Sequence, residues 1–571
     1  MVVRDELLLI FDLTSTLLRA GVGVHDLIRG PLIELPTRVG RMAGKQGNRV
    51  EDFLVGAQLA AAEAVTAAGG VQDFDIIDPV HLDPTTGSLI VDDWHALEAV
   101  FRYAMHTSLQ LQRPPLAHPT VLSIPPNLST STVDHLHRLL FERLLVPQLL
   151  VSTRPFFAAG AAGIQSGLVV DVGYRAEGTE ISAVHENQLV PAASAFRLPD
   201  LDEGVCDDYC LFRLLEADPS IEQQLLDAKR AATGGRGDSS GGPAVEFAPG
   251  ELANAMRRVV SDLKVHNAIS FESPLLGPDM TRQLQLGIQQ ASGEGDASEE
   301  GTLDVAKVIV EGKVDEIVHG TGASKSQKGR DENGDDGDDD EGGKSVRVAN
   351  PYAPPAAAAA GSEPPASAAA TIRIGPVRHR YLEPLFFPKV LACLAPSPSS
   401  SPSTASSPAP SSTLATKLFG REYEKFGPSA LAAPHAGLHE AVGVVLSSLS
   451  DEQVRNAVSE AVVVVSSGRI ANNRALGPAL IPLLSPFRSD PSAGVYDPDG
   501  TAPSRTTRFA KTPNYFSSFK DRGGDWAVYL GACIMGKLLI GDAQSRLFMS
   551  KQDYAAHGPA HYRLLDAIGG V

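Results

Sequence analysis

The chain has 571 residues, of which 43% are hydrophobic, so it is long enough to build more than one folded unit around a core. Its 53 glycines and 41 prolines indicate long loops. The formal net charge is −19, and residues 291–350 alone carry 16 acidic and seven basic side chains. This acidic balance argues against a basic surface that grips nucleic acid, so direct sequence-specific DNA binding is not expected.

Neither a metal site nor a membrane segment is expected. Of the four cysteines, Cys206 and Cys210 are spaced as on one helical face, but no second ligand pair follows them, so buried free thiols are favoured over a zinc site. No apolar run approaches the roughly 20 residues that span a bilayer. The charged residues at positions 4–6, before a short apolar strand, are not typical of a signal peptide.

Two stretches share one pattern. Residues 7–23 read as two apolar strands joined by a tight polar turn, with Asp12 at the end of the first strand, and residues 167–184 repeat the plan with Asp171. The repeat predicts two copies of one α/β unit facing across a cleft. An acid at the mouth of each turn, surrounded by turn amides, suits a metal–phosphate ligand.

The remaining predicted elements follow in chain order. After Gly40, residues 42–52 are short and polar. We predict helices beginning near Asp92 and over residues 129–145, and a buried strand ended by prolines over residues 118–126. Later elements are a helix over residues 256–272 and, at residues 447–468, a helix, a buried strand and a turn.

Three inserts interrupt the folded sequence. They cover residues 231–243, 291–371 and 395–415, and their low hydrophobicity with dense charge or Pro, Ala and Ser predicts disorder. Within the second, residues 303–318 are an ordered-looking island of unassigned role. The acidic run 331–341 is typical of a solvating tail, with histone binding as the alternative.

Seven segments, in unbroken order, resemble the actin family: residues 7–23, 30–41, 89–101, 167–186, 436–442, 462–469 and 548–563. The resemblance implies an α/β actin fold of two RNase-H-like lobes, an actin-like ATPase domain with inserts. The first lobe would comprise residues 1–154 and be completed by residues 526–571. The second would comprise residues 155–525.

The resemblance also implies a nucleotide site, but several positions depart from the family pattern. Thr14 and Thr16 replace glycines, and each added side chain obstructs the approach of backbone amides to phosphate. Arg154 stands where actins carry the glutamine that positions the attacking water, and an arginine can neither orient that water nor act as a base. We therefore expect no catalytic residues and no hydrolysis, and the cofactor is either none or ATP. The degenerate nucleotide site would comprise Asp12, Thr14, Ser15, Thr16, Arg19, Asp171, Gly173, Lys264, Ser467 and Gly468.

The first hairpin (residues 7–23), residues 33–41 and residues 513–532 look most like the divergent fungal actin-related proteins of SWI/SNF and RSC chromatin-remodelling complexes. This implies a non-catalytic nuclear subunit that docks on a helical segment of the remodelling ATPase, beside a second actin-related protein. The docking groove would lie at the hinge and on the C-terminal tail: Pro155, Phe156, Phe157, Gly160, Gly163, Leu538, Leu539 and Phe548.

Two alternatives stay open at this point. One is an ATP-binding actin-like ATPase, against which the altered phosphate loops argue. The other is a cytoskeletal actin relative, against which the polar stretch 42–52 argues, because filament-forming actins carry a longer loop with an apolar tip there.

Overall fold

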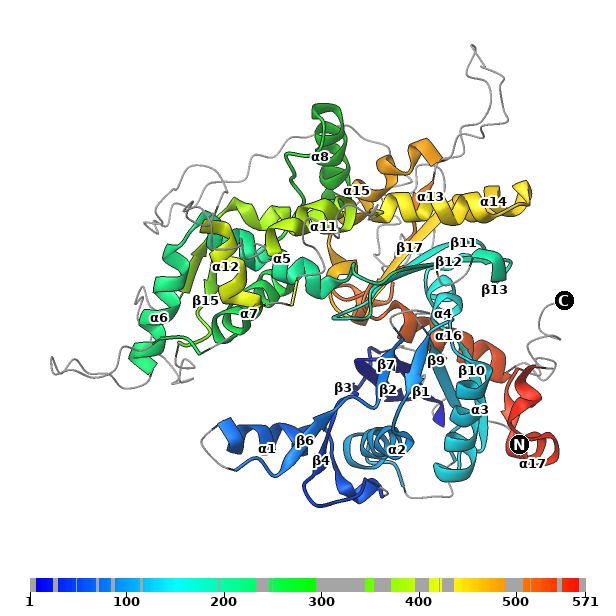
Figure 1. The fold of residues 1–571 in the computed structure, drawn as a ribbon. Coiled ribbons are helices and arrows are strands. Elements are labelled where there is room, and N and C mark those ends of the chain that lie inside the picture. The colour runs from blue at the N-terminus through cyan, green and yellow to red at the C-terminus, as the bar shows by residue number, and fades with distance from the viewer. Residues whose placement is uncertain are drawn as a thin grey trace, which may run out of the picture.

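The computed structural model consists of two lobes joined at a pair of helices, α4 and α16 (Figure 1). The described residues are 7–23, 29–47, 49–67, 71–83, 88–112, 117–193, 196–232, 246–248, 250–293, 345–353, 371–395, 410–420, 422–423, 436–487, 507–513, 515–541 and 547–563.

The first lobe is built on a six-stranded sheet in the order β19-β10-β9-β1-β2-β3. Its strands are β1 (Leu9–Leu13), β2 (Leu17–Val22), β3 (Ile33–Pro36), β9 (Thr120–Ile124), β10 (Gln148–Thr153) and β19 (Met549–Ser550). The first hairpin forms as predicted, with Asp12 opposite Arg19, and β9 runs parallel to β1. Because β19 pairs with β10, the C-terminal part of the chain returns to this lobe. Helix α17 (Lys551–His557) follows it.

Both predicted helices of this lobe begin at polar caps. The Asp93 side chain accepts hydrogen bonds from the first backbone amides of α2 (Trp94–Arg102), and Ser129 caps α3 (Thr130–Arg138). Each helix continues into a short π-helix, over Tyr103–Ser108 and Leu139–Arg143. The apolar sides of α2 and α3 join the core beneath the sheet.

A smaller extension projects from this lobe, on the left of Figure 1. It comprises a three-stranded sheet of β4 (Val39–Met42), β5 (Phe53–Leu54) and β6 (Phe74–Ile77), with α1 (Ala57–Ala67). The polar stretch 42–52 connects β4 to β5. A separate hairpin pairs β7 (Val80–Leu82) with β8 (Leu89–Val91).

The second lobe repeats the plan of the first. Its sheet runs β13-β12-β11-β17-β18, with β14 added to β12. As in the first lobe, an antiparallel hairpin (β11–β12) lies beside a parallel strand, here β17. The strands are β11 (Gly167–Val172), β12 (Thr179–His185), β13 (Gln188–Leu189), β14 (Phe196–Leu198), β17 (Ala461–Ser466) and β18 (Arg508–Phe509). The two copies of one α/β unit that the repeat predicted are therefore confirmed.

Helices surround this second sheet and extend away from it, together with a small two-stranded sheet. The helices are α5 (Glu203–Ala217), α6 (Ser220–Ala232), α7 (Glu251–Val265), α8 (Pro278–Gly293), α11 (Glu383–Phe386), α12 (Pro410–Phe419), α13 (Leu438–Ser448), α14 (Glu452–Ser459) and α15 (Leu476–Leu483). The small sheet pairs β15 (Val346–Ala349) with β16 (Thr371–Ile374). Short 3-10 turns lie at Val50–Asp52, Pro191–Ala193, Pro376–Arg380, Pro388–Leu394, Ile470–Asn472, Ser485–Phe487, Ser517–Phe519 and Pro559–His561.

The hinge has a core of its own, between the two sheets. Helices α4 (Arg154–Ala161) and α16 (Ala527–Gly541) pack on each other and against apolar side chains from both lobes. The two helices approach each other closely at Gly531, where an added β-carbon would lie 1.7 Å from the carbonyl oxygen of Phe157. The glycine is thus required by backbone proximity.

The predicted inserts are narrower than the sequence suggested. Residues 345–353 were expected to be disordered, but Val348 is buried in β15 opposite Ile372. Likewise α12 begins at Pro410 and buries Ala415, inside the predicted insert 395–415. These parts of the prediction were wrong because the apolar positions pair only with partners distant in sequence. Residues 233–245, 294–344, 354–370 and 396–409, which include 303–318 and 331–341, lie outside the described residues.

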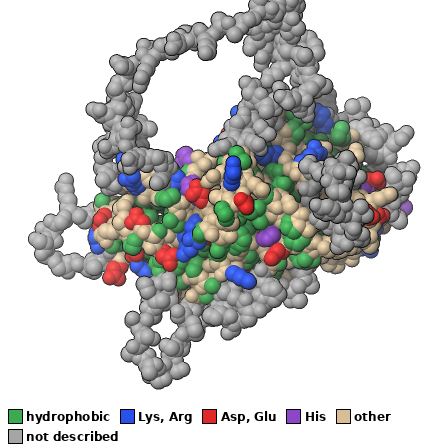
Figure 2. Space-filling view, turned by 90° about the horizontal axis from the view of Figure 1, so that it is seen from above, with side chains coloured by type: hydrophobic (Ala, Val, Ile, Leu, Met, Phe, Trp, Pro, Cys, Tyr) green, Lys and Arg blue, Asp and Glu red, His purple; other side chains and the backbone are tan. Residues whose placement is uncertain are grey.

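The structure can be compared with the expectations about a membrane, a metal ion and nucleic acid. Within the described ranges, no helix has the length and hydropathy to cross a membrane. No group of three or more His, Cys, Asp or Glu side chains there is arranged to hold a metal, and all four cysteines are free thiols. On the face shown in Figure 2, Lys and Arg side chains lie scattered among acidic and apolar ones.

Candidate functional site: an ion network between the lobes

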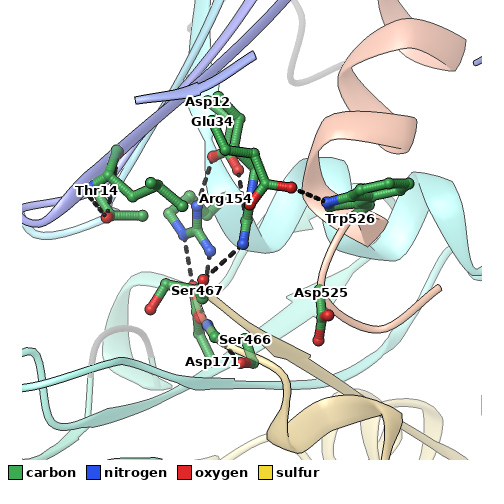
Figure 3. Close-up of polar contacts among 12 residues, drawn as sticks. Asp12, Thr14, Glu34, Arg154, Asp171, Ser466, Ser467, Asp525 and Trp526 are labelled. Atoms are coloured by element: carbon green, nitrogen blue, oxygen red, sulfur yellow. Dashed lines mark hydrogen bonds and ion pairs between the residues drawn. The ribbon is translucent and has the colours of Figure 1, made fainter. Parts of the chain in front are cut away.

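Arg154 joins the acids of the two hairpins. Its Nη1 donates to Asp12 Oδ1 at 2.5 Å, and its Nε donates to Asp171 Oδ2 at 2.6 Å. Figure 3 shows the guanidinium, at the start of α4, between Asp12 of the first lobe and Asp171 of the second. Arg154 and Asp12 are buried. Although burial disfavours the charged guanidinium, the two carboxylates raise the pKa of Arg154 above its ordinary value.

A second arginine crosses between the lobes beside it. Arg19, on β2, is 1% exposed, and its Nη2 donates to the backbone carbonyl of Ser467 at 2.6 Å. Its Nη1 lies 3.4 Å from Asp12 Oδ2, so Asp12 is held by two guanidinium groups. The structure therefore brings together four of the predicted nucleotide-site residues: Asp12, Arg19, Asp171 and Ser467. Their contacts are made within the protein, because Arg154 binds the two acids and Arg19 binds Asp12 and Ser467.

The turn of the first hairpin is closed by its own threonines. The Thr14 hydroxyl accepts from the backbone amide of Leu17 at 3.0 Å, and the Thr16 hydroxyl and amide both donate to Glu177. The side chain of Ser15 donates to the same carboxylate at 2.9 Å. The polar groups of this predicted phosphate loop are thus already engaged by the protein.

The turn after β17, which holds Ser467 and Gly468 of the predicted site, is also occupied by a carboxylate. Glu203, which is 1% exposed, accepts from the backbone amides of Arg469 and Ile470 at 2.7 and 2.9 Å. A β-carbon on Gly468 would lie 2.1 Å from Glu203 Oε2, so any larger residue there would have to displace this carboxylate. Lys264 binds Glu203 at 2.7 Å and Asp207 at 2.7 Å. Burial opposes the Lys264 charge, but these acids raise its pKa.

Two small cavities lie along the predicted nucleotide site in the described part of the chain. The cavity at the hairpin turns, lined by Thr14, Arg154, Asp171 and Gly173 among others, measures about 40 Å³. A second, beside Lys264 and Arg469, measures about 20 Å³. Such volumes hold a few water molecules, since a water needs at least roughly 10–15 Å³ by the same measure. The cationic and acidic side chains that would contact phosphate and metal instead neutralise one another.

One acid near this network lacks a full set of partners. Asp525 is fully buried; its Oδ2 accepts from Arg522 at 3.3 Å, and within the described part of the chain its Oδ1 has no hydrogen-bond partner. Burial, with Glu203 nearby, raises the pKa of Asp525 to about 7. The folded protein therefore holds a proton on Asp525 at pH values where the unfolded chain, with an Asp pKa of about 3.9, has released it.

We expect the stability contribution of Asp525 to fall as pH rises from about 4 to about 7, because the unfolded state loses the proton first. The loss should approach about 1.4 kcal/mol per pH unit in that window. Urea unfolding of wild type and Asp525→Asn at pH 5, 6 and 7 measures it, since the Asn side chain does not titrate. If the free energy of unfolding changes equally with pH in the two proteins, the pKa of Asp525 is not raised.

The predicted docking groove needs correction at the hinge. Phe157 is fully buried in the hinge core and Pro155 is also buried, so neither offers surface to a partner. Gly160 faces Met535 of α16, whose Sδ would be 3.2 Å from an added β-carbon. The hydrophobic pattern of α4 did not reveal this, because α16, which covers that helix, is distant in sequence.

The other groove residues retain exposure at the edge of the hinge. Phe156, Leu539 and Phe548 are partly buried and pack on the rim of the hinge core, whereas Gly163 and Leu538 are exposed. Leu538 has 62% of its surface exposed, which is high for a leucine at the end of a hinge helix. These five residues define what is called here the hinge-rim surface.

Sequence reasoning missed the acids that fill the cleft. Glu177 and Glu203 carry no motif, and each becomes important only through backbone amides of a distant turn. In the structure, the non-glycine residues Arg175 and Ala176 beside Glu177 adopt positive φ angles of 43° and 59°.

Comparison with known proteins agrees with this architecture. Residues 5–198 match the family model described as Actin. The chain is similar to actin-like protein 7B of Mus musculus (25% identity over 222 residues, 38% of this chain and 47% of that protein). It is also similar to actin-related protein 4 of Arabidopsis thaliana (31% over 128 residues, 22% and 27%). A third relative is the SWI/SNF and RSC complexes subunit arp9 of Schizosaccharomyces pombe (25% over 223 residues, 34% and 42%).

Each of these matches spans less than half the length of the relative. The matched family region nonetheless contains both Asp-bearing hairpins, and the two sheets repeat one α/β plan about a shared hinge, in the α/β actin fold that the sequence predicted. Residues 5–198 therefore carry an actin-family domain, within a chain that has the α/β actin fold.

Proposed function

We propose that this protein is a non-catalytic, nuclear actin-related subunit of a chromatin-remodelling complex of the SWI/SNF or RSC type. The observation that carries the proposal is the position of Arg154, which neutralises Asp12 and Asp171 with its own guanidinium. These are the acids that a metal–phosphate ligand would require. The similarity to arp9, a subunit of SWI/SNF and RSC complexes, supports the class of assembly.

The rival proposal is an ATP-binding actin-like ATPase, and nucleotide binding separates the two. We expect calorimetric titration with Mg-ATP to give no binding heat, because Arg154, Glu177 and Glu203 occupy the donors and acceptors of the site. Phosphate release should equal the buffer blank. A release rate that disappears in Asp171→Asn would overturn the non-catalytic assignment.

The partner we propose is a helical segment of the remodelling ATPase, bound on the hinge-rim surface. Leu538, Leu539 and Phe548 supply apolar area there, and Gly163 has no atom within 4 Å of an added β-carbon, which leaves room for a helix. A second actin-related protein would lie beside this one on the same helix. Histones stay a candidate ligand of the acidic run 331–341.

We expect Leu538→Asp to weaken binding of that helical segment by at least about tenfold, because a desolvated carboxylate replaces an apolar contact. The control is Val444→Asp on α13 of the second lobe, where Val444 is also about half exposed. Both variants should keep the wild-type circular dichroism. If Leu538→Asp binds as tightly as Val444→Asp, the helix docks elsewhere.

A further inference from the structure

The carboxylate of Glu177 lies where three loops converge. It projects from the turn between β11 and β12, and five hydrogen bonds end on it. From the first lobe, Ser15 Oγ, Thr16 N and Thr16 Oγ1 donate to Oε1 at 2.9, 3.1 and 2.9 Å. From the second lobe, Tyr174 N and Ser467 Oγ donate to Oε2 at 3.0 and 2.5 Å.

The local backbone is shaped to place this side chain. Gly173 is required next to it, because a β-carbon there would lie 2.3 Å from the β-carbon of Glu177. Arg175, Ala176 and Gly178 all have positive φ angles, and left-handed geometry at the first two is unfavourable for residues with a β-carbon. A turn that holds two such residues persists only when its surroundings fix it.

The donors that Glu177 receives are of the kind that bind a phosphate. They include two turn amides and three hydroxyl groups, directed from the first hairpin, the second hairpin and the turn after β17 at one point. Burial alone would raise the pKa of Glu177, but the hydrogen bond from Ser467 and the others lower it, so the group is an anion at neutral pH.

We infer that Glu177 is an internal anion that takes the place of a bound phosphate and holds the two lobes closed without any ligand. The inference rests on the proposed function, because it presumes that no nucleotide enters the cleft. It adds that lobe closure is permanent, so that the hinge-rim surface is presented to a partner in one fixed shape.

The test is chemical rescue of Glu177→Ala by an external anion, with inorganic phosphate as the probe. Removing the carboxylate vacates the donors of Ser15, Thr16 and Ser467. Hydrogen exchange at the Thr16 and Tyr174 amides should speed up by roughly tenfold or more, the effect of losing hydrogen bonds to a charged group. Millimolar phosphate should restore part of the melting temperature of this variant and slow the exchange again, and it should do neither in wild type.

The matched control is Glu180→Gln. Glu180 lines the same cavity, and burial together with nearby Asp171 raises its pKa to about 8, so the neutral glutamine resembles its protonated form. This variant should show no phosphate response. If Glu177→Ala does not fold, Glu177→Gln serves instead. Its uncharged amide fills the site, so exchange at the Thr16 amide should still speed up, whereas no rescue by phosphate is expected.

Two outcomes would overturn the inference: unchanged exchange at Thr16 in the Glu177 variants, or equal stabilisation of wild type and Glu177→Ala by phosphate. A failure of the proposed function looks different. In that case wild type itself would bind Mg-ATP in the calorimetric titration, whatever the Glu177 variants do.

Discussion

Arg154→Gln is expected to cost the folded protein about 3–5 kcal/mol, because it leaves two carboxylates in a largely buried site without their shared counter-charge. Asp12 is fully buried and retains only the longer contact to Arg19, at 3.4 Å. Asp171 loses both of its contacts to the guanidinium. Urea unfolding at pH 7, followed by circular dichroism, measures the loss.

Two further variants isolate the cause. Arg154→Lys keeps the charge but cannot reach both acids with separate nitrogen atoms. Its free energy of unfolding should therefore lie between that of wild type and that of Arg154→Gln. Adding Asp12→Asn to Arg154→Gln should restore part of the stability, because it removes one of the unpaired charges. A loss below about 1 kcal/mol for Arg154→Gln, the range of surface pairs, would contradict the role assigned to this residue.

Gly531→Ala is expected to cost about 3 kcal/mol or more, at or above the upper end of the range for overpacked cores. The added β-carbon would meet the carbonyl oxygen of Phe157 at 1.7 Å and its carbonyl carbon at 2.5 Å, and both atoms belong to the backbone of α4. Backbone cannot rotate away as a side chain can, so α4 and α16 must move apart and the hinge core opens. The melting temperature measures the effect.

The same helix pair supplies a matched control. In Gly160→Ala the added carbon would meet only the flexible end of Met535, at 3.0 Å from Cγ and 3.2 Å from Sδ. Alanine also favours a helix over glycine by about 1 kcal/mol, so this variant should be close to wild type in stability. If Gly531→Ala melts at the temperature of Gly160→Ala, the backbones of the two helices are not in close contact at Gly531.

Local sequence determined the repeated hairpins and the elements around them. The apolar runs that contain Asp12 and Asp171 form strands. Such runs can be recognised from the sequence because a short apolar pattern over neighbouring residues is enough to indicate a buried strand. The starts of α2 and α3 were equally local, since Asp93 and Ser129 cap their own helices. The same local patterns, kept in order along the chain, carried the resemblance to the actin family.

Only the tertiary structure decided how these parts interact. The sequence marked Arg154 as a departure from the family pattern, but its bonds to Asp12, 142 residues away, and to Asp171 arise from the meeting of two lobes. For the same reason, the sequence did not reveal the roles of Glu177 and Glu203. It also did not predict that residues 346–349 form strand β15, because the partner strand β16 lies beyond an insert. Hydrogen bonds and ion pairs depend on distances of a few ångströms, and spacing along a chain fixes such distances only within one helix, turn or hairpin.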